Sequence, residues 1–215
     1  MSLIRLQLAA IAILAAASAF GQAVPSDPAI PPSPHLSAQA AQYTPITGKQ
    51  RWNWFVRSTI GPQSLAAGLL SAGLGTATDS PPEYRGTWAG FGKRYGMRLT
   101  GVSTGNAMEA GLGAIWGEDP RYFRDQGAPF GHRVLNIIKL TFAARRPDGD
   151  FSPAYARYIA TAGNNFLSNT WRVSSEADSQ HAVERTLLGF VGRMGSNAFQ
   201  EFWPDVRQHL FKKNH

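Results

Sequence analysis

The chain has 215 residues, no cysteine and a formal net charge of +7. The lack of cysteine excludes a disulfide framework and thiol chemistry, and the length suits one domain with its own core. The excess of arginine and lysine favours anionic partners such as lipid head groups, although a surface charge that only keeps the protein soluble would give the same balance.

Residues 1–23 have the pattern of a secretory signal peptide. Arg5 precedes an apolar run from Leu6 to Ala17, and two small-x-small cleavage sites follow it, ending at Ala19 and Ala23. The apolar run is shorter than the roughly 20 residues of a membrane span. We therefore expect export to the periplasm or cell envelope, with a retained N-terminal anchor as the alternative. Nucleic acid is not an expected partner of an exported protein.

Residues 24–46 follow as an expected linker. This segment holds six prolines and a single charged side chain, that of Asp27. Such a composition cannot form a helix interior or a core, so an extended, disordered tether is predicted. The folded domain is expected to cover residues 47–215.

Helical patterns predict that this domain is all-α, a single glycine-rich bundle of about six helices. Thr47 is a suitable N-cap for a first helix that ends near Ile60. Gly61 and Pro62 separate it from a second helix, and Pro62 suits a first helical turn. The remaining expected helices cover residues 62–77, 87–116, 133–144, 153–171 and 174–202. Ser152 and Pro153 resemble an N-cap with a proline at the first helical position, and Pro204 is expected to kink or restart the last helix.

Glycine is concentrated in the first half of this domain. Thirteen of the 22 glycines lie between Gly61 and Gly117, although each costs a helix interior roughly 1 kcal/mol relative to alanine. The usual reason for such glycines is close approach of two helix backbones. The spacings Gly92/Gly96, Gly101/Gly105 and Gly68/Ala72 predict seams of this kind.

Two patterns leave membrane association open. Residues 58–78 are uncharged, and these 21 residues are long enough for a bilayer. Their many alanines and glycines make a buried core helix the better interpretation. The six tryptophans are expected near helix ends, where they would form either an interfacial belt or plugs of a bundle. They are Trp52, Trp54, Trp88, Trp116, Trp171 and Trp203.

The C-terminal segment carries an apolar stripe. Phe199, Phe202, Trp203, Val206 and Leu210 recur at helical spacing. Docking on the bundle is preferred, because the stripe would otherwise expose a large apolar patch. The alternative is a helix that lies in the membrane interface.

The densest polar cluster is the loop from Glu118 to Arg124. Glu118 and Asp119 are candidates for acid/base work, and Arg121 and Arg124 for binding an anionic group. This combination would suit an envelope hydrolase or a lipid-modifying enzyme. The competing interpretation is an ion-paired loop that fixes the connection between two helices.

Charged and amide side chains inside helical patterns form a second set of candidates. Glu109 is expected to pair with an arginine of a neighbouring helix, such as Arg157 or Arg193, and is a weak candidate for a general acid. The asparagines at positions 164, 165 and 169 lie in an apolar stretch, where buried amides must find partners. Asn164, Asn165 and Asn169 therefore either bridge helices or line a polar pocket, as in a soluble periplasmic binding module.

No catalytic motif is recognisable. No two histidines share metal-ligand spacing, and neither a P-loop nor a nucleophile elbow is present, so no metal and no cofactor are predicted. The leading hypothesis is a basic, helical cell-envelope protein with a structural or membrane-associated role. Its expected partner is an anionic lipid or membrane surface, and its oligomeric state does not follow from the sequence.

Overall fold

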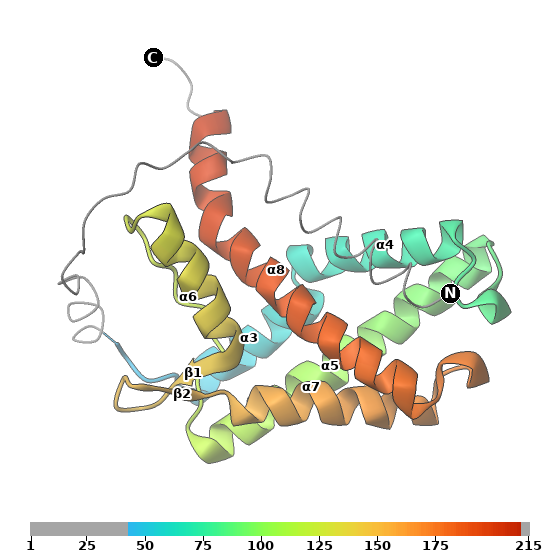
Figure 1. Cartoon of the computed structure of the whole chain (residues 1–215), viewed down its shortest axis with the longest axis horizontal. Coiled ribbons are helices and arrows are strands. Elements are labelled where there is room, and N and C mark those ends of the chain that lie inside the picture. Colours follow the sequence, from blue (N-terminus) through green and yellow to red (C-terminus); the bar gives the residue numbers. More distant parts are fainter. Residues whose placement is uncertain (1–42, 212–215) are drawn as a thin grey trace. The chain divides into compact units, whose positions relative to one another are not determined.

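The computed structural model describes residues 43–211, with side chains up to residue 209. This part of the chain is mostly helical, with one small antiparallel sheet (Figure 1). The expected signal peptide and most of the expected linker lie outside the described residues. Two residues near the end of the expected linker, Tyr43 and Thr44, contact the helical domain through Asp119 and Arg121.

The first two helices have the predicted bounds. Helix α3 (Gly48–Ile60) begins with a capping box, in which the side chain of Thr47 accepts from the backbone of Gln50 and the side chain of Gln50 accepts in return. Helix α4 (Pro62–Ala77) follows after Gly61, whose backbone amide still bonds to the carbonyl of Arg57 at 3.0 Å. The uncharged run 58–78 is thus divided between two helices. Among residues 43–211, no helix combines the length and apolar content that a bilayer crossing requires.

The longest helix in the first half of the described domain is α5 (Trp88–Trp116), which follows the short 3₁₀ helix η1 (Pro82–Tyr84). Thr87 caps it, accepting from the backbone amide of Gly90 at 3.1 Å. Gly117 ends it in a left-handed conformation, with φ 72°, which favours glycine. Helix α5 packs against α3, α4 and α7, so three other helices contact it.

The prediction for the region around Ser152 and Pro153 is wrong. Helix α6 (Phe130–Phe142) leads into strand β1 (Ala143–Arg145), which pairs with strand β2 (Phe151–Pro153). Ser152 and Pro153 thus belong to a strand, and α7 (Tyr155–Leu167) begins only after Ala154. The helix does not need a serine cap because the Glu118 carboxylate accepts from its first amides.

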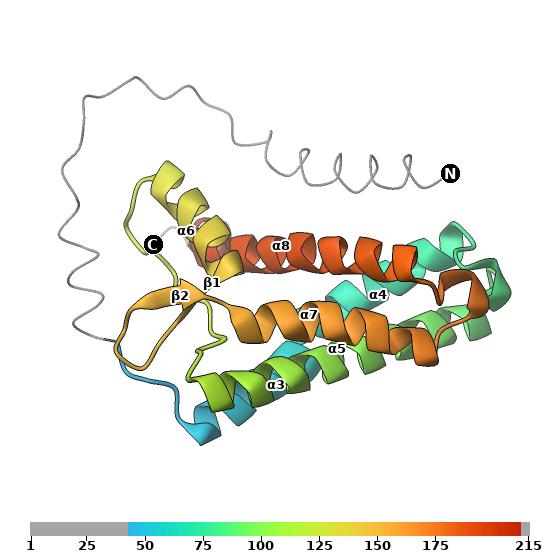
Figure 2. The same ribbon diagram turned by 60° about the horizontal axis from the view of Figure 1, so that its bottom comes forward.

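Two 3₁₀ turns, η2 (Ser168–Thr170) and η3 (Ser174–Glu176), connect α7 to α8 (Ser179–Phe211). Helix α8 continues through Pro204, so the expected restart is wrong. In the turn before this proline, the carbonyl of Glu201 accepts from Arg124 and Arg133. Figure 2 shows α7 between α5 and α8, in agreement with their contacts.

The interior of the described domain is mostly small and polar. Its buried hydrophobic residues are six alanines and two larger side chains, Ile137 and Leu140. Charged side chains are buried beside them, namely Arg94, Glu109, Glu118, Asp119, Arg145, Arg157 and Glu201. Because apolar burial is the main driving force of folding in water, this distribution is unusual for a protein surrounded by water alone.

The glycines of α5 fall into two groups. A methyl group at Gly90 would lie 2.1 Å from the carbonyl oxygen of Tyr84, and one at Gly105 would lie 3.2 Å from the Asn164 amide. Outside its own helix, however, a methyl group at Gly92, Gly96 or Gly101 would have no heavy atom within 4 Å. The predicted seams at these three positions are therefore wrong.

Candidate functional site

The first carboxylate of the 118–124 loop caps a helix. The Glu118 side chain is buried, and its two oxygens accept from the backbone amides of Tyr155 and Ala156 at 3.1 and 3.0 Å. These amides belong to the first turn of α7, where unpaired N–H groups and the helix dipole favour a negative charge. The location of Glu118 is explained by this structural role.

The second carboxylate, Asp119, is bound on two sides. Arg121 donates to it from Nε at 3.0 Å and from Nη2 at 2.6 Å, and the Tyr43 hydroxyl donates at 3.0 Å. Burial, followed by the negative charge of Asp119, raises the pKa of Tyr43 to about 12. The carboxylates of Glu118 and Asp119 are thus both committed to partners within the protein.

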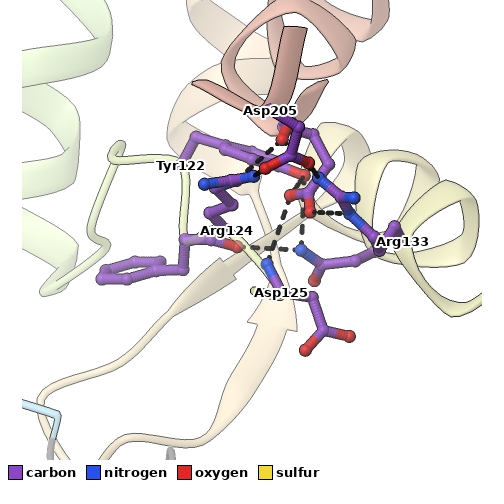
Figure 3. Close-up of polar contacts among 8 residues, drawn as sticks. Tyr122, Arg124, Asp125, Arg133 and Asp205 are labelled. Atoms are coloured by element: carbon purple, nitrogen blue, oxygen red, sulfur yellow. Dashed lines mark hydrogen bonds and ion pairs between the residues drawn. The ribbon is translucent and has the colours of Figure 1, made fainter. Parts of the chain in front are cut away.

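Arg124, at the end of the loop, belongs to a network of hydrogen bonds and ion pairs around Glu201. Figure 3 labels its members Tyr122, Arg133 and Asp205. The side chain of Glu201 is fully buried. It accepts from the Tyr122 hydroxyl at 2.6 Å and from Arg133 Nε at 2.7 Å, while its backbone carbonyl accepts from Arg124 Nε at 2.7 Å. Asp205 lies one turn further along α8 and pairs with both arginines.

The network around Glu201 was missed by sequence reasoning. A lone glutamate among the aromatic residues of α8 was the available signal, because a carboxylate on an apolar stripe requires partners when it is buried. The partners come from a loop and from α6, about seventy residues away in the sequence, and no local pattern indicates them. These hydrogen bonds and ion pairs hold the 118–124 loop against α8.

Glu109 does pair with the expected arginines. Its Oε1 lies 2.9 Å from Nε of Arg157 on α7, and its Oε2 binds Arg193 on α8. Arg157 also donates to the carbonyl of Leu140 at 2.6 Å, and Arg193 lies over the ring of Trp54. One carboxylate thus serves two arginines, and this local cluster keeps a net positive charge.

The three candidate asparagines have different partners. Asn164 bridges α7 and α5 by donating to the carbonyl of Gly101 at 3.0 Å, and its own Oδ1 is buried without a hydrogen bond. Asn165 bonds to Thr161 of the same helix. Asn169 accepts from Arg185 at 2.5 Å and donates to the loop that precedes α8.

An open cavity of about 1720 Å³ brings several candidates together. It is bounded by α3, α4, α5, α7 and α8, and Glu109, Arg121, Asn164 and Asn165 all line it. Glu118, Asp119, Arg124 and Asn169 do not. The cavity lining thus includes the interior candidates, but only Arg121 among the candidate residues of the 118–124 loop.

The lining of this cavity is strongly cationic. Eight arginines line it, against two glutamates, and the lining includes no aspartate, lysine or histidine. The arginines are at positions 57, 94, 98, 121, 157, 172, 185 and 193. The glutamates are Glu109 and Glu176, and each is held in an ion pair, Glu176 by Arg172. Such a lining suits an anion and offers no carboxylate that is free to act as a base.

Within the part of the chain that the structure describes, no group of histidines and carboxylates could hold a metal ion. No family model matches the chain, and neither a curated protein nor a solved structure is significantly similar to it.

Proposed function

We propose that this is an exported, basic cell-envelope protein whose folded part is a single glycine-rich bundle of about six helices, and that it associates with the membrane through its apolar exterior. The observation that carries the proposal is the location of the large apolar side chains. Twenty-two of them are exposed on the described domain, whereas the interior holds charged and small residues. This is the reverse of the usual distribution in water-soluble domains.

The exposed apolar side chains follow helix geometry. On α7, Tyr155, Ile159 and Phe166 are exposed, and on α8 Val183, Leu187 and Val191 are exposed four residues apart. Residues at this spacing share one face of a helix. The opposite faces of α7 and α8 carry Arg157 and Arg193, which bind Glu109 inside the domain. The two helices are thus amphipathic, with their apolar faces outward.

A lipid environment explains this exterior better than a single protein partner. Exposed apolar residues occur on α3, α4, α5, α6, α7 and α8, and they include Trp88, which is 89% exposed, and Ile115, which is 77% exposed. A protein partner would cover one patch of a few hundred Å², whereas a membrane contacts many elements at once. The net charge of +7 favours anionic head groups.

The tryptophans support an interface in part. Trp88 and Trp116 are the first and last residues of α5 and both are exposed, as expected for side chains at head-group level. Trp203 is also exposed but lies within α8. Trp54 faces the interior, where Arg193 lies over its ring. The interfacial belt proposed here therefore includes the two ends of α5 and excludes Trp54.

The enzyme alternative has less support. An envelope hydrolase or lipid-modifying enzyme built on the 118–124 loop needs an available carboxylate. Glu118 caps α7 and Asp119 is paired with Arg121. The second alternative, a binding module, is favoured by the cavity and does not conflict with membrane association.

Vesicle flotation tests the proposal. The full chain, produced with its own N-terminus, should be found in the envelope fraction, and the purified protein should float with phosphatidylglycerol vesicles even in high salt, because apolar contacts are not screened. The double variant Leu187→Gln and Val191→Gln changes the outward face of α8 and should float less. The matched control Gln180→Ala and Gln208→Ala alters exposed polar positions of the same helix and should float as the wild type does. A protein that stays in the soluble fraction and binds no vesicles contradicts the proposal.

A further inference from the structure

We propose that the cavity between α3, α4, α5, α7 and α8 is a binding site for a ligand that carries a phosphate-type oxyanion. Arg57 and Arg98 would hold the oxyanion near the first turn of α4, Arg193 would add positive charge further along the cavity, and the body of the ligand would lie along glycines of α5 and α8. This inference does not depend on membrane association, because the arginines that would hold the oxyanion belong to the cavity lining and not to the outward apolar faces of α7 and α8.

Five of the eight arginines that line the cavity are committed to the protein. Arg94 donates to the backbone carbonyls of Ser80, Pro81 and Arg85, and Arg157 binds Glu109 and α6 carbonyls. The other three pair with nearby groups: Arg121 with Asp119, Arg172 with Glu176, and Arg185 with Asn169. These side chains maintain the walls of the cavity.

The remaining three arginines lack a full set of acceptors. The Arg57 side chain has no hydrogen-bond or ion-pair partner among the described residues, and this residue is exposed. Arg98 makes one hydrogen bond, to the carbonyl of Ser64 at 3.1 Å, and meets no carboxylate. Arg193 shares the carboxylate of Glu109 with Arg157. Burial lowers the pKa of Arg98 and of Arg193, as expected for cations that are desolvated with too little negative charge nearby.

Two of these arginines lie at the first turn of α4, and the helix that carries the third also reaches this turn. The carbonyl of Arg57 accepts from Gly61, and Arg98 binds Ser64. Helix α8 reaches the same turn, because Gln63 donates to Ser196, one turn after Arg193, at 3.2 Å. Helix α4 has no side-chain cap at its N-terminus, and residues 61–64 line the cavity. A helix N-terminus attracts anions through its free amides and its dipole, so the arginines and the helix favour the same charge at one place.

Glycines give this site its width. Gly101 of α5 and Gly192 and Gly195 of α8 line the cavity. A methyl group at any of the three would have no neighbouring heavy atom within 4 Å outside its own helix. Glycine in a helix costs roughly 1 kcal/mol relative to alanine, and packing does not offset that cost here. Open space surrounds these glycines, as it does Gly92 and Gly96 outside the cavity, and at the cavity the ligand would occupy it.

The size of the cavity indicates a large ligand. Its volume of about 1720 Å³ exceeds the roughly 300–1,000 Å³ of common small-molecule pockets. Apolar side chains, among them Leu70, Leu188 and Phe199, line it beside the cations. The same oxyanion chemistry is available from a lipid head group and from a soluble phosphate, and the experiment separates the two sources.

Calorimetric titration of the full chain in an uncharged detergent tests the site. The probes are inorganic phosphate and a short-chain phosphatidic acid. Arg57→Gln and Arg98→Gln should each weaken binding by roughly tenfold or more, because each removes a charge-assisted hydrogen bond. Lys93→Gln removes an exposed cation of α5 that does not line the cavity, and this control should bind as the wild type does.

A second pair of variants tests the glycine-lined space. Gly101→Leu should fill the cavity and abolish binding of phosphatidic acid without loss of helical signal. Gly96→Leu lies five residues earlier on α5, also in open space but outside the cavity lining, and should leave binding unchanged. Binding of phosphatidic acid but not of phosphate assigns the site to a lipid head group, and binding of both assigns it to the oxyanion itself. Binding of neither probe, or equal loss in the arginine variants and in Lys93→Gln, overturns the proposal whether or not the protein binds vesicles.

Discussion

Glu109 on α5 and Arg157 on α7 form an ion pair that is almost completely buried, with 2.9 Å between Oε1 and Nε. The other oxygen of Glu109 binds Arg193 of α8, so a single carboxylate connects three helices. In a water-soluble bundle this position would be filled by large apolar side chains. Buried charges thus hold these helices together, whereas most of the large apolar side chains are exposed.

Removing the central carboxylate should strongly destabilise the fold. Glu109→Gln leaves two arginines without a counter-charge in the interior, and loss of one partner of a buried pair costs about 3–5 kcal/mol. Chemical unfolding followed by circular dichroism measures this change. Glu184→Gln on α8 is the control, because Glu184 is partly exposed and contacts only Gln180 at 3.1 Å, and it should stay within about 0.5 kcal/mol of the wild type. Equal stability of the two variants would show that the triad is not a structural centre.

The helices from α3 to α5 were largely predictable because their limits are set by local chemistry. Thr47 and Gly61 act on the residues next to them, and α3 and α4 have the expected bounds. Pairing of Glu109 with arginines could be anticipated from composition, since a charge in a helical interior needs a partner. The choice of both Arg157 and Arg193 required the packing of α5, α7 and α8.

Features that depend on distant residues could not be predicted. Glu118 caps α7 from 37 residues away, so the local signal of Ser152 and Pro153 was misleading. The glycine pattern had two possible causes, close packing and open space. Sequence spacing does not distinguish Gly105, where an added methyl group would meet Asn164, from Gly101, where it would meet no heavy atom within 4 Å.

Two glycines of one helix should respond oppositely to the same substitution. Gly90→Ala places a methyl group 2.1 and 2.3 Å from the backbone carbonyls of Tyr84 and Arg85, and overpacking of this kind costs about 1–3 kcal/mol. Gly92→Ala meets nothing within 4 Å and should stabilise α5 by up to about 1 kcal/mol. Thermal unfolding of both variants measures the difference. A higher midpoint for Gly90→Ala than for the wild type would mean that the loop before α5 packs differently.

The role of Glu118 as a cap has a local signature. Glu118→Ala leaves the amides of Tyr155 and Ala156 without their carboxylate, and loss of an N-cap costs about 0.5–2 kcal/mol. Hydrogen exchange at these two amides should accelerate, while exchange in the middle of α7 should change little. The exposed carboxylate of Asp148 is the control site, and Asp148→Ala should leave the first turn of α7 protected. Unchanged exchange in Glu118→Ala would exclude the capping role.

Asp205 should make stability depend on acid pH. Hydrogen bonds from Arg124 and Arg133 hold the pKa of this carboxyl below its ordinary value. Its contribution is therefore fully present above the unfolded pKa of about 3.9 and is lost as pH falls through the lower folded pKa. The midpoint difference between the wild type and Asp205→Asn should be constant from neutral pH to about pH 4 and should vanish below that. A difference that persists at lower pH would mean that the aspartate acts without its charge.

The C-terminal part of α8 should prove essential because of Glu201 rather than because of its aromatic stripe. Phe199 and Trp203 stack on each other but remain exposed, whereas Glu201 is fully buried and binds Tyr122 and Arg133. A chain that ends at residue 197 loses these contacts and should unfold at a much lower temperature. Glu201→Ala in the full chain should reproduce most of this loss, since it leaves buried donors without an acceptor. Gln200→Ala, one position earlier and exposed, should not. If the shortened chain keeps its thermal midpoint but no longer floats with phosphatidylglycerol vesicles, the segment is a membrane anchor and the docked arrangement around Glu201 is not what stabilises the domain.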